Sequence, residues 1–319
     1  MPTGQGWIME NKFKHKSVLL DESIDALNIK PDGVYVDGTA GGGGHSFEIA
    51  SLLDSGSLIA IDRDPDAIKA AGERLALFKK NVTLVQSNFS RLSLILSELE
   101  IPGANGILLD LGVSSYQFDA PERGFSYNYD APLDMRMSKS GVSARDIVNT
   151  ASFEELARIL REFGEEKFAS RIASAIVSQR EKKPVETTFE LCEIIKSAIP
   201  AAARRSGPHP ARRTFQALRI AVNGELDELS ALLDDALSLL LPGGRLAVIT
   251  FQSLEDRMVK QRFLSWAQGC ICPPDLPVCV CGHKPQVNII RKKGVEPSQN
   301  EVDENPRSRS ARLRFCEKI

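Results

Sequence analysis

The 319-residue sequence lacks a strong charge imbalance and any long apolar run. Its formal net charge is −2, which excludes a globally basic nucleic-acid binder, although local basic patches remain compatible with it. No segment is long and apolar enough to span a membrane, and the N-terminus lacks the apolar core of a signal peptide. We therefore expect a cytoplasmic globular protein without a membrane partner, with a flexible N-terminus at residues 1–14.

Four consecutive glycines, residues 41–44, follow an apolar segment that ends in Asp37. Residues 34–36 favour a buried parallel strand, and residues 46–53 have helical spacing. A strand, a glycine turn and a helix form the first unit of a nucleotide-binding α/β sheet, where glycine lets the backbone approach a ligand closely. The alternative is a tight turn without a ligand, but ordinary turns rarely contain four glycines in a row.

The spacing of these glycines distinguishes two classes of ligand. The dinucleotide pattern G-x-G-x-x-G, read from Gly41 and Gly43, requires a glycine where Ser46 stands. The pattern acid-x-Gly-x-Gly-x-Gly fits from Asp37 to Gly43 if Thr39 replaces one glycine. That version is typical of S-adenosylmethionine sites, because a carboxylate can hold the cationic amino group of that ligand.

A second acid supports a ligand site. Residues 57–61 read as the next strand, which ends in Asp62 about 20 residues beyond the glycines, where a carboxylate can bind both ribose hydroxyls. Asp64 and Pro65 then predict a helix start, with Asp64 as the N-cap. Capping is the favoured role of Asp64, whereas Asp62 has no expected capping role and is assigned to binding.

Strand and helix signals alternate in the first third of the chain and return in the last third. This organisation predicts a right-handed βαβ series interrupted by a helical segment. Predicted strands are residues 82–85, 106–112 and 245–251, with a closing antiparallel pair at 287–290 and 311–315. Predicted helices are residues 153–160, 167–180 and 188–198, then one long amphipathic helix from Phe215 to Leu240, and a helix opened by a capping box at residues 253–256.

Ligands in such sheets bind at the carboxyl ends of the strands, near the point where the strand order reverses. Asp110 follows three apolar residues at a strand end, which favours binding or catalysis over a simple helix cap. Phe89 can stack on an adenine edge or pack in the core, and the sequence leaves both open. Four further residues can line the same cleft: Gly112, Ser114, Ser115 and Gln117.

Taken together, these motifs resemble the bacterial small-subunit ribosomal RNA methyltransferase H family, also called MraW. The matching segments are the glycine loop through His45 and residues 15–20, 62–65, 110–115, 122–126, 132–137, 213–220, 253–257 and 305–310. The resemblance implies a Rossmann-like class I methyltransferase sheet with an inserted all-α domain. It places the methyltransferase domain at residues 15–120 and 211–319, and a helical substrate-recognition insert at 121–210.

The same resemblance implies a reaction and its partners. It predicts S-adenosylmethionine-dependent methylation of the exocyclic N4 of a cytosine in the decoding region of 16S ribosomal RNA, within the small ribosomal subunit, and suggests a homodimer. Cofactor contacts are implied for Gly43, Gly44, His45, Asp62, Phe89, Asp110 and Gln117, beside Asp37 and Gly41. Two departures are visible: Tyr116 stands where proline is common, and Gln252 where histidine is common.

The expected reaction needs no covalent intermediate with the protein. The N4 amine of cytosine is a weak nucleophile, so the enzyme must place it in line with the methyl group and accept hydrogen bonds from it. Asp110, Ser114 and Ser115 are the predicted catalytic residues. No nucleophilic cysteine is needed, and the base must leave its stack to enter the cleft.

Basic residues form local clusters despite the net charge. Any one cluster can be ordinary solvated surface, but four of them favour a surface that follows RNA phosphates. The clusters are residues 180–183, Arg204 and Arg205 with Arg212 and Arg213, residues 291–293, and Arg307, Arg309, Arg312 and Arg314.

The six cysteines divide into two groups. Cys192 and Cys316 read as buried side chains, whereas Cys270, Cys272, Cys279 and Cys281 enclose a proline-rich loop with His283 nearby. Four thiolates can hold a structural zinc, but the C-x-C spacing is tighter than the usual C-x-x-C. Disulfides are disfavoured in the cytosol. The sequence therefore favours free thiols over zinc at this loop.

Other classes of protein remain as alternatives. A Rossmann dehydrogenase conflicts with the missing third glycine. A non-catalytic, cofactor-binding ribosome-assembly factor conflicts with the intact set of Asp37, Asp62 and Asp110. A methyltransferase acting on another nucleic-acid amino group agrees with the same site residues.

Overall fold

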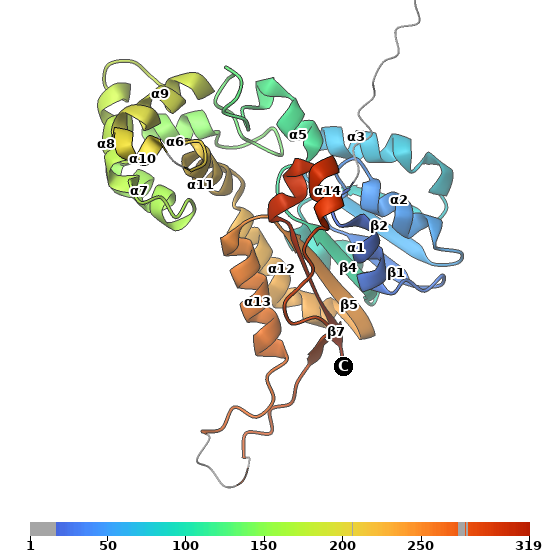
Figure 1. The fold of residues 1–319 in the computed structure, drawn as a ribbon. Helices are drawn as coiled ribbons and strands as arrows, with labels where there is room; N and C mark the ends of the chain where they lie inside the picture. The colour runs from blue at the N-terminus through green and yellow to red at the C-terminus, as the bar shows by residue number, and fades with distance from the viewer. Residues whose placement is uncertain (1–16, 206, 274–277, 279) are drawn as a thin grey trace, which may run out of the picture.

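The computed structural model describes residues 17–205, 207–273, 278 and 280–319, and the side chains of all of these except Ser115 and Tyr116. The predicted flexible terminus at residues 1–14 and two residues of the family motif, His15 and Lys16, lie outside this part. The chain forms a helical body joined to a larger α/β body (Figure 1).

The larger body is built on one seven-stranded sheet with the order β3-β2-β1-β4-β5-β7-β6. The strands are β1 (Val34–Asp37), β2 (Ser57–Asp62), β3 (Val82–Gln86), β4 (Ala104–Asp110), β5 (Leu240–Thr250), β6 (Val287–Ile289) and β7 (Arg312–Lys318). Strands β1 to β5 are parallel, and β7 is antiparallel to both β5 and β6. The strand order reverses between β1 and β4. This is the Rossmann-like sheet of class I methyltransferases, as predicted.

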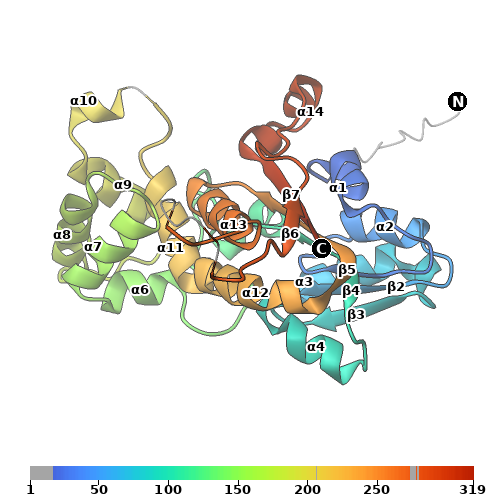
Figure 2. The ribbon, with the colours of Figure 1, turned by 90° about the horizontal axis from the view of Figure 1, so that it is seen from below.

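Helices cover both faces of the sheet (Figure 2). One face packs on α1 (Leu20–Leu27), α2 (Gly44–Ser51) and α3 (Pro65–Arg74), and the other on α4 (Leu92–Glu98), α12 (Glu225–Leu239) and α13 (Ser253–Trp266). The predicted start of α3 is confirmed: Asp64 is the N-cap, its side chain accepts from the Asp66 N–H at 3.0 Å, and Pro65 follows. Both apolar sheet faces are thereby buried, as a parallel sheet requires.

The helical body has its own apolar core. Its helices are α6 (Ala144–Thr150), α7 (Phe153–Glu162), α8 (Ala169–Arg180), α9 (Thr188–Ala198), α10 (Ala201–Arg204) and α11 (Arg212–Asn223). Hydroxyl caps at Ser143, Ser152 and Thr187 begin three of them. Phe215 and Leu218 of α11 belong to this core, which therefore extends beyond residue 210, the predicted end of the insert.

The single long helix predicted from Phe215 to Leu240 is wrong. Gly224 adopts a left-handed conformation, with φ of 60°, and its N–H bonds to the Ile220 carbonyl, which ends α11. The next residue begins α12, and Leu240 is already the first residue of β5. The apolar spacing continues across the break because both helices have a buried face. Gly224 is therefore a better indicator of the helix end than the apolar spacing.

The capping box predicted at residues 253–256 is also wrong. The N-cap of α13 is Gln252, without a side-chain cap, and the Ser253 hydroxyl donates to Glu165 Oε2 at 2.8 Å. Glu255 instead accepts from the Phe251 N–H at 3.0 Å. This acid is therefore turned inward, toward the end of β5.

Two short helices lie above the carboxyl edge of the sheet. These are α5 (Ser115–Asp119), directly after β4, and α14 (Gln299–Glu304), close to the C-terminus (Figure 1). Glu301 of α14 accepts from the Leu19 N–H at 2.7 Å, and Arg307 pairs with Asp119. These contacts hold the last part of the chain over the strand ends. Within the described residues, no helix combines the length and the apolar character needed to cross a membrane.

Candidate active site

Asp37, Asp62 and Asp110 end three neighbouring strands, as the sequence predicts. β1 lies between β2 and β4, so the three carboxyl groups share the carboxyl edge of the sheet at its point of reversal. The chain after β1 is fixed across this point, because the Gly38 N–H bonds to the Leu108 carbonyl at 2.9 Å and the Ala40 N–H to the Ile61 carbonyl at 2.8 Å. The glycine loop therefore spans all three strands.

Asp37 lies beneath this loop and is almost fully buried. Its two oxygens accept from the Ser46 hydroxyl at 2.6 Å and from the Thr39 N–H at 3.1 Å. Burial raises the pKa of this carboxyl to about 6, although both hydrogen bonds act against the shift.

Asp62 holds the same loop from the neighbouring strand. One oxygen accepts from the Gly41 N–H at 2.8 Å and the other from the Asp64 N–H at 2.9 Å. As expected, Asp62 does not cap α3, because the N-cap is Asp64, but it has a structural role in the loop that the sequence did not predict. Burial raises its pKa, and the side chain remains partly exposed, so contact with a ligand stays a prediction.

Asp110 differs from both, because one of its oxygens has no donor among the residues that the structure describes. The backbone N–H of Asp110 donates to Thr39 Oγ1 at 2.6 Å, which fixes the residue against the glycine loop. Its Oδ1 is buried, and no group in the described part of the chain donates to it. Burial, and then the charges of Asp37 and Glu255, raise its pKa well above the usual value.

His45 faces the other oxygen of Asp110. The imidazole is buried; its Nε2 lies 3.1 Å from the Val18 carbonyl and its Nδ1 lies 3.7 Å from Asp110 Oδ2. Because a carbonyl only accepts, Nε2 carries a hydrogen. The Nδ1 side of the ring therefore faces the carboxyl group of Asp110.

The glycines of the loop have different neighbours. Gly41 and Gly43 adopt positive φ angles of 51° and 75°. A Cβ at Gly43 would lie 3.2 Å from the backbone of Ala71 in α3, and one at Gly44 would overlap the Ser17 hydroxyl. A Cβ at Gly41 would meet nothing closer than 3.9 Å. Packing within the protein thus explains Gly43 and Gly44, whereas Gly41 borders open space.

The segment after β4 uses its polar side chains internally. Gln117 is buried; its Nε2 donates to Asp64 Oδ2 at 2.8 Å, and its Oε1 accepts from the Ser114 N–H at 3.1 Å. The Ser114 hydroxyl caps α5 by accepting from the Gln117 N–H at 3.3 Å. The side chain of Ser115 lies outside the described residues. Phe89 packs, partly buried, against the core below β3, so its contact with an adenine stays a prediction.

Sequence reasoning missed a buried polar group at the end of β5. Glu255 is 2% exposed, and its pKa is raised by burial. Gln252 Nε2 donates to Glu255 Oε1 at 2.8 Å, while Gln252 Oε1 is buried with no donor among the described residues. The sequence around Glu255 predicts a helix cap, so its pattern alone does not reveal this buried acid.

Asp64 has a second role beyond its cap. Its Oδ2 also accepts from Arg123 Nη1 at 2.9 Å, and Arg123 Nη2 donates to the carbonyls of Arg136 and Met137 at 2.9 Å. This buried ion pair ties the segment that leads to the helical insert to the start of α3. Because removal of either partner would leave an uncompensated buried charge, the pair holds these two segments in one relative position.

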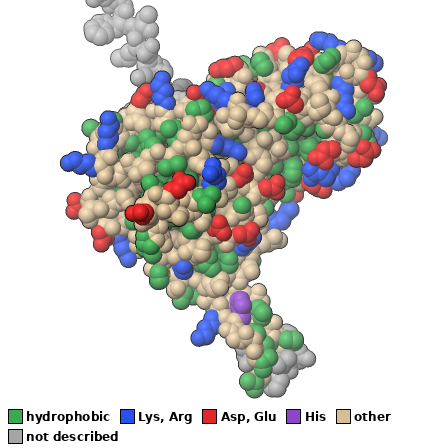
Figure 3. All heavy atoms as spheres, turned by 180° about the vertical axis from the view of Figure 1, so that it is seen from behind, with side chains coloured by type: hydrophobic (Ala, Val, Ile, Leu, Met, Phe, Trp, Pro, Cys, Tyr) green, Lys and Arg blue, Asp and Glu red, His purple; other side chains and the backbone are tan. Residues whose placement is uncertain are grey.

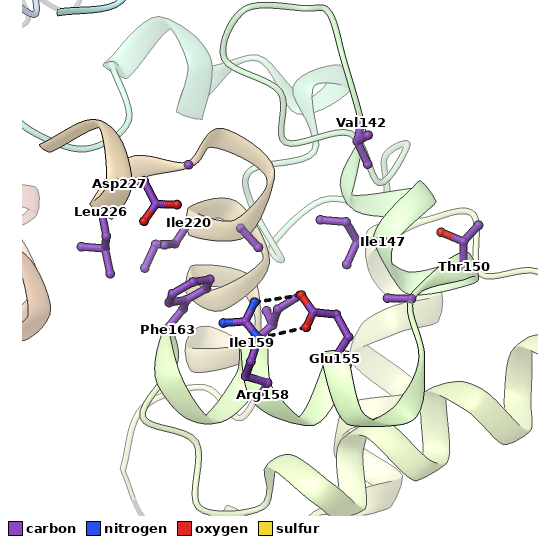
Figure 4. A pocket seen from close by; sticks show the side chains of 13 residues that line it. Val142, Ile147, Thr150, Glu155, Arg158, Ile159, Phe163, Ile220, Leu226 and Asp227 are labelled. Carbon is purple, nitrogen blue, oxygen red and sulfur yellow. Dashed lines mark hydrogen bonds and ion pairs between the residues drawn. The ribbon is translucent and has the colours of Figure 1, made fainter. Parts of the chain in front are cut away.

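A cavity of 330 Å³, which none of the strand-end acids lines, lies between the helical body and the first turn of α12 (Figure 4). Its lining is mainly apolar, and Arg158 donates to both oxygens of Glu155 at 2.9 and 2.8 Å. These charges neutralise each other. The remaining charged residue of the lining is Asp227, so the cavity does not bring several acids together as the strand ends do.

The basic clusters are only partly available to a ligand. Arg314 is buried and forms a bidentate pair with Asp256, Arg312 pairs with Glu296, and Lys183 pairs with Glu190. The exposed members that form no ion pair with another described residue are Lys182, Arg204, Arg205, Arg212, Arg213, Arg291, Lys292, Lys293 and Arg309, whereas the exposed Lys183 and Arg307 are paired. Acidic and basic side chains are interspersed on the face in Figure 3. The predicted phosphate surface is thus reduced mainly to the α10 region and residues 291–293.

The strand order and the acids at the strand ends define a methyltransferase of the Rossmann-like class. The chain belongs to the MraW methylase family, which matches residues 12–319. It is 57% identical over 310 residues to a protein of Agathobacter rectalis named "Ribosomal RNA small subunit methyltransferase H 2", covering 96% of this chain and 99% of that protein. It is 55% identical to "Ribosomal RNA small subunit methyltransferase H" of Lachnospira eligens, covering 98% and 100%.

Solved structures resemble the chain more distantly. An rRNA methylase from Streptococcus thermophilus has a TM-score of 0.39 and 13% identity, covering 94% of this chain and 93% of that one. A protein from Thermotoga maritima described as an S-adenosylmethionine-dependent O-methyltransferase has a TM-score of 0.39 and 10% identity, covering 97% and 69%. The family assignment rests on the sequence relatives alone.

Proposed function

We propose that this protein transfers a methyl group from S-adenosylmethionine to the exocyclic N4 of a cytosine in 16S ribosomal RNA of the small subunit. The observation that carries the proposal is Asp110. It ends the strand at the point of reversal, one of its oxygens is buried with no donor in the part of the chain that the structure describes, and its pKa is raised well above the usual value by burial and by neighbouring acids. A strongly perturbed acid in this position is a mark of a functional site.

The strand-end acids fit a cationic ligand. Asp37, Asp62, Asp110 and Glu255 all have raised pKa values, with burial as the first cause. A bound positive charge favours the ionised form of each nearby carboxyl and relieves this cost. S-adenosylmethionine carries a sulfonium and an ammonium group, and when bound it supplies a methyl group already activated for transfer. Gly41 and Asp62 are the residues best placed to hold it.

Two unpaired acceptors suit an amine as the methyl acceptor. Asp110 Oδ1 and Gln252 Oε1 are both buried with no donor among the described residues; Asp110 ends β4, and Gln252 lies just after the adjacent strand β5. An exocyclic amine has two N–H groups, so two acceptors can orient it and draw electron density onto nitrogen. Glu255 holds the Gln252 amide by accepting from its Nε2, which leaves the Gln252 oxygen as the acceptor.

The predicted serines contribute less directly. The Ser114 hydroxyl oxygen already accepts the capping hydrogen bond from the Gln117 N–H of α5. Its own hydrogen remains as a donor to a ligand. Ser115 stays a prediction. We assign Asp110 and Gln252 as the acceptors for the amine, and His45 as a positioning residue beside Asp110.

A methyl-transfer assay tests the proposal. Purified protein is incubated with methyl-labelled S-adenosylmethionine and small subunits from cells that lack the modification, with naked 16S RNA in parallel. We expect label in 16S RNA with the wild-type protein and little with Asp110→Asn. Label that enters only ribosomal protein, or equal transfer by both proteins, would contradict the proposal. The two substrates also show whether the assembled particle is required.

The same assignment includes a cytoplasmic location and a homodimer. Sedimentation of the purified chain over a range of concentrations tests the dimer. A single monomeric species at all concentrations would rule it out.

A further inference from the structure

The cysteine-containing loop between α13 and β6 has a geometry that the sequence did not predict. About twenty residues separate these two elements. A loop of this length that has no secondary structure and buries no apolar side chains usually needs another interaction to hold it in one conformation. Ile271 and Val280 on the loop are 55% and 77% exposed, so apolar packing does not supply it. The loop extends from the body at the end of α13 (Figures 1 and 3).

Three thiols nevertheless converge. The sulfur atoms of Cys270, Cys272 and Cys281 all lie within 4.8 Å of one another. Those of Cys270 and Cys281 are 3.8 Å apart, far beyond the bond length of about 2.0 Å in a disulfide. In a tetrahedral site with zinc–sulfur bonds of about 2.3 Å, two sulfurs are separated by about 3.8 Å. The spacing therefore matches ligands of one metal ion.

The backbone around these sulfurs is arranged to favour thiolates. The N–H groups of Ile271 and His283 point to Cys281 Sγ, and that of Cys272 to Cys270 Sγ, each at 3.4 Å. Both Cys270 and Cys281 thus accept from the residue two positions further along the chain. Donors aimed at sulfur stabilise the negative form that binds a metal.

The neck of the loop is also fixed. The Gln286 N–H donates to the Trp266 carbonyl at 2.8 Å, and His283 Nδ1 lies 2.8 Å from the Gly269 carbonyl. These contacts hold the two arms of the loop side by side, so the cysteines from each arm face one another. The loop is thus held together at its base by these two contacts and further out by the cluster of sulfur atoms.

We propose that Cys270, Cys272 and Cys281 bind one structural zinc ion that orders this loop. Zinc is the divalent ion that thiolates select in a structural tetrahedral site. The three thiolates leave one position for a further donor; Cys279 of the predicted set lies outside the described residues. This inference reverses the sequence-based preference for free thiols, because the C-x-C spacing does not prevent convergence once the two arms meet.

The ion stabilises structure and takes no part in the reaction. Helix α13 begins at the carboxyl end of β5 and runs back along the sheet, so the loop leaves from the edge opposite Asp110 (Figure 1). Loss of the ion should therefore loosen the loop without changing cofactor binding. This separates the proposal from the proposed function, since either can fail alone.

Metal analysis of the full chain tests the site. After dialysis against metal-free buffer, wild-type protein should retain about one equivalent of Zn²⁺ per chain, and Cys270→Ser and Cys281→Ser should retain almost none. Cys192→Ser, a buried thiol in α9, is the matched control and should keep the ion. Wild-type protein without zinc, or zinc retained in both variants, would overturn the proposal.

Cobalt substitution gives a second readout that does not depend on variants. Wild-type protein refilled with Co²⁺ should show thiolate-to-cobalt charge transfer and the visible bands of tetrahedral Co²⁺. Protease cleavage within the loop should accelerate after metal removal, while the thermal midpoint of the sheet body stays constant. Octahedral bands, or a disulfide among these cysteines in freshly purified protein, would contradict a zinc site.

Discussion

Carboxyl groups at the strand ends and carboxyl groups on the helical insert have pKa values displaced in opposite directions. Burial raises the pKa of Asp37, Asp62 and Asp110. On the insert, a hydrogen bond from Ser143 lowers the pKa of Asp146, and one from Arg158 lowers that of Glu155. The ionised form of a carboxyl group is thus destabilised at the strand ends and stabilised on the insert.

This difference separates function from stability. The insert acids cap helices and pair with neighbours, which favours the folded state by itself. The strand-end acids oppose folding when ionised, and a cationic ligand compensates them. The sheet edge thus has the electrostatics expected of the proposed reaction site, whereas the acids of the helical insert stabilise its own fold.

The largest expected effect comes from removing the charge at Asp110. Asp110→Asn keeps the shape but replaces an anionic acceptor by a neutral one. We expect the single-turnover methyl-transfer rate to fall about a hundredfold, which is typical for loss of one preorganised electrostatic contact. Cofactor affinity, measured by calorimetry, should fall by less than this. Glu155→Gln on the insert is the control and should leave both values unchanged.

Two substitutions in the glycine loop distinguish packing from ligand contact. Gly43→Ala strains a positive φ, at about 1 kcal/mol, and adds a contact with α3 that costs about 1–3 kcal/mol more. Gly41→Ala carries only the strain of about 1 kcal/mol but places a methyl group beside the ligand space. In denaturant unfolding, Gly43→Ala should be the less stable of the two variants. In calorimetry, under conditions where both variants are fully folded, Gly41→Ala should bind the cofactor more weakly. The reverse ranking would contradict our view of the loop.

The opposite pKa shifts predict opposite dependences on pH. The raised pKa of Asp37, about 6, means that the folded state keeps a proton that the unfolded chain loses near its usual value of 3.8. The free energy of unfolding of the ligand-free protein should therefore fall by about 3 kcal/mol as the pH rises between these values. Asp146, with its lowered pKa, contributes stability that is lost only as the pH falls below 3.8.

Cofactor affinity should show the complementary trend. Binding of a cation requires the ionised carboxylate, so affinity should weaken about tenfold for each pH unit below about 6. Calorimetric titrations from acid to neutral pH measure this directly. Affinity that is constant across the range would show that Asp37 does not sense the ligand.

The smallest expected effect is on RNA binding by the insert. Arg204 and Arg205 are exposed at the end of α10, and replacing both by Ala should reduce the slope of log affinity against log salt by about 2. Arg158→Ala removes an exposed insert cation that is already paired with Glu155 and Glu162, and should leave the slope unchanged. Equal slopes for all three proteins would remove the α10 region from the RNA surface.

Much of the site follows from the sequence, because its acids obey a local rule. Asp37, Asp62 and Asp110 each end an apolar strand, and strand ends of a parallel sheet meet at one edge. Glu255 and the Gln252 oxygen escape this rule, since the burial of these groups depends on how α13 packs against β5. Gly224 carried a visible signal for a helix break, but the continuing apolar period outweighed it.

The cysteine loop and the basic clusters show a second limit. Convergence of Cys270 and Cys281 depends on backbone hydrogen bonds across the loop, which spacing alone does not encode. The pairing of Arg314 with Asp256 joins residues 58 positions apart, so a cluster that reads as phosphate-binding is partly structural. Local periodicity is readable from sequence, whereas pairing between distant side chains is not.

The position of the transferred methyl group tests the central claim most directly. Small subunits that lack the modification are incubated with the protein and S-adenosylmethionine, and the 16S RNA is digested to nucleosides and analysed by mass spectrometry. Two acceptors that hold an amine predict N4-methylcytidine at a single site. A methyl group on ring carbon, on ribose or on a base without an exocyclic amine would contradict the roles assigned to Asp110 and Gln252.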